Sequence, residues 1–139
     1  AFDAAYKLAP ASLARLHCGD MFLREKHWDE ARALYEAATK ETNILVTNER
    51  LRYGILLSFL GAKNDEAARA ALDKMTFPTE SPAYYYAQAA WSFAHDANGD
   101  GEKWMRRAEA VFPVKSTAWF VRPLFDLGWV KTKPPLIAD

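Results

Sequence analysis

The segment DANGDGEKWMRR, residues 96–107, places oxygen-bearing side chains at the spacing that opens a calcium-binding EF-hand loop. Asp96, Asn98 and Asp100 stand at the first three ligand positions, and a turn glycine follows them. The last ligand position of such a loop needs a bidentate glutamate, but the residue there is Arg107. Because a cation at that position would repel calcium, metal binding is the less favoured of two interpretations.

The favoured interpretation is a turn between two helices at residues 97–101. Asn-Gly and Asp-Gly pairs in this segment favour the positive φ angles that a tight turn needs. Asp100 is suited to cap a helix that starts near Gly101. We therefore predict no metal site and no cofactor here.

Zinc binding by His17, Cys18 and His27 is also disfavoured. Neighbouring His and Cys side chains point about 100° apart on a helix, which suits no shared ligand. We expect Cys18 to be a buried structural thiol. We expect His95 to end a helix and to hydrogen-bond its last carbonyl groups.

The sequence contains no pattern typical of an enzyme. It has no glycine-rich phosphate loop after a strand, no G-x-S-x-G and no H-E-x-x-H. Acidic pairs such as Asp29 with Glu30 are explained by helix caps and solvated faces. We therefore predict that the chain is not catalytic.

Composition predicts a folded protein without nucleic-acid or membrane chemistry. The chain has 139 residues, half of them hydrophobic, and a formal net charge of zero. A nucleic-acid-binding domain usually has a large positive excess, so the basic segment 103–133 is interpreted as a solvated face rather than a binding patch. No apolar run approaches the ~20 residues that a membrane-spanning helix needs.

Helix-forming residues between regularly spaced breakers predict an all-α fold. Nowhere does the sequence alternate β-branched and polar residues as a strand would. The pieces between the breakers have the length of short helices joined by tight turns. The breakers are Pro10, Asn43, Gly61, Pro78, Pro82, Gly99, Gly101 and Pro113.

The pieces repeat with a period in the mid-thirties. The triplet Asp-Glu-Ala at 29–31 recurs at 65–67, 36 residues later. Residues of the first segment recur 33 positions later, namely Phe2, Ala5 and Pro10 as Tyr35, Ala38 and Asn43. This period, with two helices in each unit, is typical of an α-solenoid.

Residues 18–38, CGDMFLREKHWDEARALYEAA, resemble the tetratricopeptide repeat (TPR) family. The resemblance is carried by Cys18-Gly19, Phe22, Trp28, Ala31, Tyr35 and Ala38. It implies that Gly19 and Ala31 lie where two helices cross and that the aromatic rings fill the space beside them. Asp29 is expected to cap the second helix.

The resemblance implies antiparallel helical hairpins stacked as a right-handed superhelix in a single domain, residues 1–130. After this domain an extended tail, residues 131–139, is expected. A terminal helix would cover the last repeat and be kinked or interrupted at Pro123. The expected parts are the end of a truncated repeat (1–10), repeats at 12–43, 47–78 and, degenerate, 82–113, and the capping helix (116–130).

The predicted function is non-catalytic protein–protein interaction, as a scaffold that binds a partner segment in a concave groove. The first helix of each hairpin would line this groove. Asp20 would repel a peptide's terminal carboxylate, so an apolar helix or extended segment is the expected ligand. The predicted groove residues are Leu13, Leu16, Asp20, Leu23, Arg24, Asn48, Leu51, Ile55, Ser58, Phe59, Tyr84 and Gln88.

The same residues allow other interpretations. The apolar residues of the predicted groove could instead pack against neighbouring repeats. The chain could then be a structural spacer, a self-associating region, or an accessory domain of a larger enzyme. Three successive helical tyrosines, 84–86, cannot all face one core, so at least one is predicted to be partly exposed.

Overall fold

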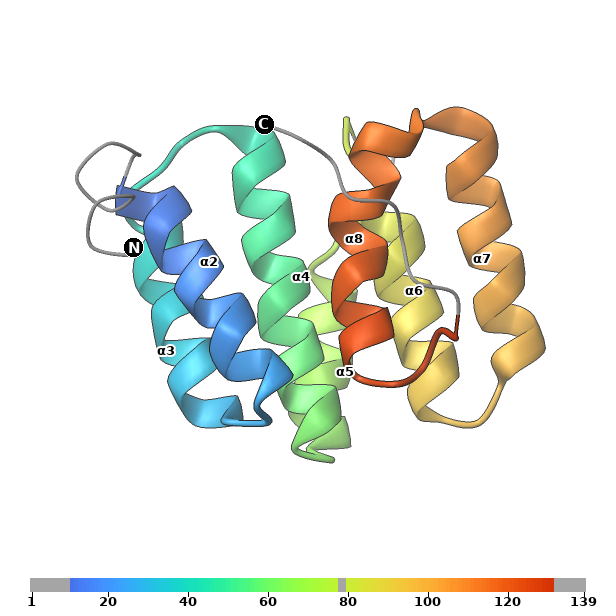
Figure 1. Ribbon diagram of the computed structural model, residues 1–139, viewed down its shortest axis with the longest axis horizontal. Helices are drawn as coiled ribbons and strands as arrows, with labels where there is room; N and C mark the ends of the chain where they lie inside the picture. Colours follow the sequence, from blue (N-terminus) through green and yellow to red (C-terminus); the bar gives the residue numbers. More distant parts are fainter. Residues whose placement is uncertain (1–10, 78–79, 132–139) are drawn as a thin grey trace. The chain divides into compact units, whose positions relative to one another are not determined.

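A computed structural model describes residues 11–77 and 80–131 of the chain (Figure 1). The expected truncated repeat at 1–10 and most of the expected tail lie outside these residues. The described part is helical and contains no strand, which confirms the all-α prediction. The helices are α2 Ala11–Arg24, α3 Trp28–Thr39, α4 Leu45–Gly61, α5 Asp65–Asp73, α6 Ala83–Ala94, α7 Asn98–Val111 and α8 Val114–Asp126.

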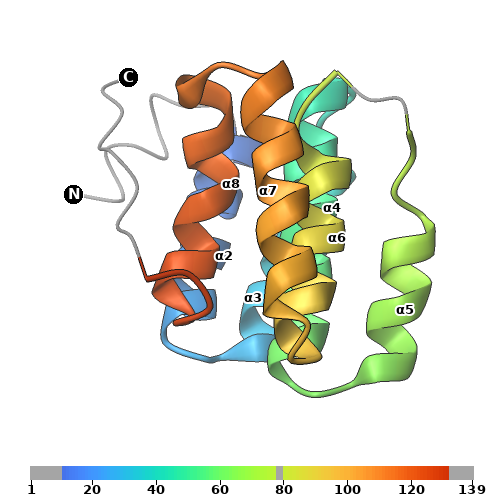
Figure 2. The same cartoon turned by 90° about the vertical axis from the view of Figure 1, so that its right-hand side faces the viewer.

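The chain divides into two compact units, residues 1–71 and 72–139, with the division inside α5. In the first unit α3 packs against both α2 and α4, and α2 also touches α4. In the second unit α6 and α7 form an antiparallel hairpin, and α8 packs on both of them (Figure 2). The stacking of repeats into a superhelix remains a prediction.

The first unit is organised around the ring of Tyr35. A methyl group at Gly19 of α2 would lie 2.6 Å from this ring, and one at Gly54 of α4 would lie 2.7 Å from it. Two helices therefore approach α3 closely because each presents a residue without a side chain. Gly19 confirms the predicted crossing, and Gly54 extends it to a third helix.

In the second unit, α8 covers the hairpin through aromatic contacts. The Tyr86 ring stacks on Phe120 at a centroid separation of 5.9 Å. α8 continues through Pro123 to Asp126, so of the two alternatives expected there, a kink or an interruption, the interruption is wrong. The proline lacks only its own N–H, and its carbonyl still accepts a hydrogen bond from the Leu127 amide at 3.0 Å.

The three turns that join α2 to α3, α4 to α5 and α6 to α7 have the same hydrogen-bonding pattern. Each contains one residue with positive φ: Lys26 at 65°, Lys63 at 61° and Asp96 at 62°. In each turn, that residue's amide bonds back to the third preceding carbonyl, and the next amide bonds to the fifth preceding one. This is the Schellman arrangement of a helix C-terminus. The hairpins thus share one local geometry.

The structure corrects the prediction for the segment DANGDG. The positive φ lies at Asp96, and residues 98–101 already form the first turn of α7. The predicted caps at Asp29 and Asp100 are wrong, because both residues lie inside the first turns of α3 and α7. They occupy positions where a carboxylate favours the helix dipole.

No helix of the described residues has the length and apolar character needed to span a membrane.

Candidate functional site

Four residues of the predicted groove are buried and present no surface to a partner. They are Leu16, Leu23, Leu51 and Ser58. The first three are apolar residues of α2 and α4, two helices that contact each other. Their burial corrects the sequence interpretation, because helix packing uses the faces that were assigned to a ligand.

Asp20, another predicted groove residue, belongs to a polar link inside the first unit. Its carboxylate accepts a hydrogen bond from the Tyr35 hydroxyl at 2.5 Å and pairs with Arg50 at 2.7 Å. Burial raises the pKa of Tyr35, and the negative charge of Asp20 raises it further. Burial alone would lower the pKa of Arg50, but nearby groups, Asp20 foremost, raise it. Asp20 therefore joins three helices.

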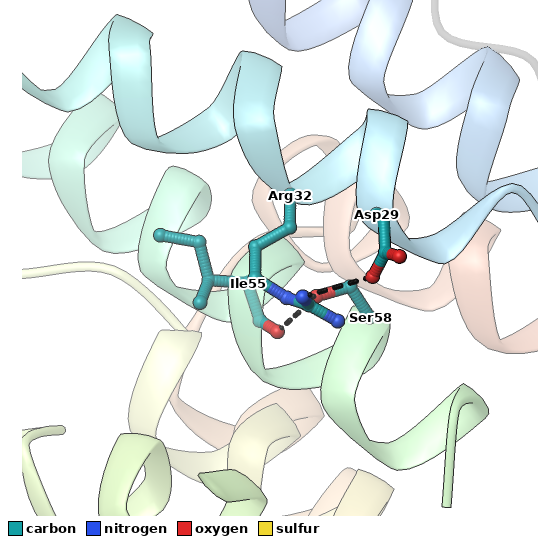
Figure 3. Close-up of polar contacts among 4 residues, drawn as sticks. All are labelled: Asp29, Arg32, Ile55 and Ser58. Atoms are coloured by element: carbon teal, nitrogen blue, oxygen red, sulfur yellow. Dashed lines mark hydrogen bonds and ion pairs between the residues drawn. The ribbon is translucent and has the colours of Figure 1, made fainter. Parts of the chain in front are cut away.

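Ser58 and Phe59 lie against α3. Figure 3 shows the Arg32 side chain reaching from α3 to Ser58 of α4, where its Nε donates to the hydroxyl at 3.0 Å. The Ser58 hydroxyl donates in turn to the carbonyl of Ile55 at 2.6 Å. The guanidinium also lies 4.0 Å from the centre of the Phe59 ring. These contacts hold α3 to α4.

The remaining members of the predicted groove keep some exposure. Leu13, Asn48, Ile55, Tyr84 and Gln88 are half-buried, and Arg24 is exposed. Within the first unit, the residues brought together therefore serve mainly to connect helices. The groove as a whole, which would span both units, stays a prediction.

Five aromatic residues of the second unit form a contiguous group that we call the aromatic surface. Its members come from four separate segments: Phe77, Tyr84 and Tyr85 of α6, Trp104 of α7, and Phe112. Phe77 lies 5.2 Å from Tyr84 and 5.8 Å from Tyr85, measured between ring centres.

Trp104 and Phe112 extend the aromatic surface along α7. The Trp104 ring centre lies 5.9 Å from that of Tyr84 and 6.3 Å from that of Tyr85. Tyr85 also contacts Phe112, at 6.1 Å. Tilted and edge-to-face pairs at these separations are the favoured geometry of aromatic rings, so the group is held in place by its own contacts.

The aromatic surface is accessible to solvent. The Phe77 side chain is 60% exposed, and the other four rings are half-buried. Tyr86 points to α8 instead and is buried. The prediction that at least one tyrosine of 84–86 is partly exposed is therefore confirmed. An exposed aromatic group of this kind marks an interaction site more often than a scattered apolar residue does.

A cation borders the aromatic surface. The guanidinium of Arg107 lies 4.7 Å from the centre of the Trp104 ring. Arg107 is exposed, as is Lys103 one helical turn before it. The site thus combines ring faces with positive charge.

Sequence reasoning identified only Tyr84 among the five members. Phe77, Tyr85 and Trp104 belong to three different segments, and the periodicity of one helix does not show that their rings come together. The signal that was present is the run Tyr84-Tyr85-Tyr86. It indicated an exposed ring without indicating its neighbours.

The metal and thiol candidates of the sequence do not form a site. Cys18 is half-buried rather than fully buried as predicted. No group of three or more potential metal ligands occurs among the described residues. The Nδ1–H of His95 donates a hydrogen bond to the Trp91 carbonyl at 2.7 Å, which confirms its role at the end of α6.

Comparison of the chain with protein-family models, curated proteins and solved structures gives no match.

Proposed function

We propose that this protein is a non-catalytic interaction module, TPR-like in its hairpins, that binds a protein partner through the aromatic surface of its second unit. The observation that carries the proposal is the accessible group of Phe77, Tyr84, Tyr85, Trp104 and Phe112. Aromatic anchors are the residues that most often dominate the free energy of protein–protein binding.

Two further features support the proposal. The rings are fixed by mutual contacts, so little conformational entropy is lost when a partner covers them. The repeated hairpin turns are compatible with the TPR resemblance of residues 18–38, and that family implies protein binding rather than catalysis.

The test is affinity capture with the wild-type protein and two matched variants. Phe77→Ser removes an apolar side chain that is 60% exposed, and Ile44→Ser removes one that is 61% exposed in the other unit. We expect proteins captured by the wild type and by Ile44→Ser to be lost with Phe77→Ser. Circular dichroism must show that both variants are folded. Equal capture by all three would overturn the proposal.

A further inference from the structure

We infer that the occupant of the aromatic surface is an acidic peptide segment of a partner protein, with apolar side chains interspersed among its carboxylates. This inference rests on the proposed function. It adds the chemical class of the partner, which follows from the charges beside the rings.

Lys103 and Arg107 are one helical turn apart on α7, so their positive charges are neighbours. Neither makes an ion pair with an acidic side chain of the described residues. Like charges at this spacing repel each other, and an incoming carboxylate would relieve that repulsion. The local charge is therefore complementary to an acidic ligand.

The aromatic surface complements the apolar part of such a ligand. Phe77 and Trp104 both contact Tyr84 and Tyr85, so their rings are continuous with one another. Since Arg107 stacks on Trp104, a carboxylate that pairs with Arg107 brings its neighbouring residues over the rings. Apolar residues beside an acidic one would be buried there.

A protein segment fits these observations better than a nucleic acid does. α7 also carries exposed Glu102 and Glu109, and the chain has no net charge. A phosphate backbone has a negative charge at every nucleotide and is usually held by a large positive excess, which this chain lacks. A peptide can place its acidic residues opposite Lys103 and Arg107 alone.

The experiment is selection from a displayed library of random peptides against the full chain, followed by fluorescence titration of the selected peptides. The charge-reversed variant is Lys103→Glu with Arg107→Glu. Its control, Lys40→Glu with Arg52→Glu, makes the same change of net charge at exposed positions of the first unit. Phe77→Ser reports separately on the rings, and a single-stranded oligothymidine is titrated in parallel.

We expect peptides enriched in Asp and Glu next to apolar residues, binding about tenfold or more weakly to the charge-reversed variant and unchanged to its control. Peptides that lose binding to Phe77→Ser but bind the charge-reversed variant equally would overturn the acidic class and leave the proposed function standing. Selection of no peptide that depends on Phe77 would contradict both. Tighter binding of oligothymidine than of any peptide would overturn the peptide inference.

Discussion

At the scale of single residues, the first unit depends on the space around one tyrosine. Tyr35 is buried, and its ring lies against glycines of two different helices. Its hydroxyl reaches Asp20, which also holds the buried Arg50. One side chain of α3 thus determines both the approach of its neighbours and the position of a buried charge.

Substitution of Gly54 by alanine is predicted to destabilise the protein by about 1–3 kcal/mol. The added methyl group would lie 2.7 Å from the Tyr35 ring, which cannot move away because Gly19 is close to it too. This cost outweighs the ~1 kcal/mol that alanine gains over glycine in a helix. The measurement is the free energy of unfolding in denaturant, compared between the variant and the wild type.

Gly99 provides the matched control for that substitution. It also lies in a helix, but a methyl group there would meet nothing within 4 Å. Gly99→Ala is therefore expected to stabilise the protein by about 0.5–1 kcal/mol. Effects of the same sign at both glycines would contradict the account.

Alkaline pH is predicted to destabilise the protein through Tyr35. Its pKa is raised by burial above its ordinary value near 10, so the unfolded state releases this proton first as pH rises. The contribution of Tyr35 to stability is therefore constant below pH ~10 and falls above it, by up to ~1.4 kcal/mol per pH unit. Tyr35→Phe should be less stable at neutral pH, since it loses the hydroxyl contact to Asp20, but should show a shallower alkaline decline. The measurement is the free energy of unfolding in urea at a series of pH values. If this free energy falls in parallel for the two proteins above pH ~10, the prediction is wrong.

At the scale of helices, the three Schellman turns repeat although their residues differ. Lys26, Lys63 and Asp96 have positive φ, a conformation in which side chains are strained. The turn before α5 has a further stabilising contact, because the Asn64 side chain accepts a hydrogen bond from the Ala67 amide at 3.2 Å.

Replacement of Lys63 by glycine is predicted to stabilise the protein by about 0.5–1 kcal/mol, because glycine adopts positive φ without strain. Lys40→Gly tests whether relief of positive φ is the cause, since Lys40 also follows a helix but has a φ of −82°. That variant should be neutral or destabilised in thermal unfolding. A gain at position 40 equal to that at position 63 would remove the conformational explanation.

Helices could be located from the sequence more reliably than their boundaries. The small residues Gly19 and Ala31, with large Tyr35, identified the first hairpin because packing at a crossing limits side-chain size. The Asn-Gly-Asp-Gly segment misled the prediction because glycine permits positive φ without requiring it. At 96, hydrogen bonds that close α6 impose that conformation on an aspartate instead.

At the scale of the whole molecule, the candidate site depends on contacts between distant segments. Leu16, Leu23 and Leu51 were predicted to line the groove but are buried. Burial depends on which helices pack together, and the pattern of a single helix cannot show this. The aromatic surface was missed for the same reason, since Phe77 and Trp104 come from different segments and both pack on Tyr84 and Tyr85 of α6.

Site-specific photo-crosslinking in cells of the source organism would show whether the aromatic surface lies against another protein. A photoreactive phenylalanine analogue is placed at Phe77 in one protein and at Ile44 in another, two side chains of equal exposure in different units. We predict a crosslink from position 77 to a different protein and no such crosslink from position 44. No crosslink from position 77, or a crosslink only to a second copy of this chain, would contradict it.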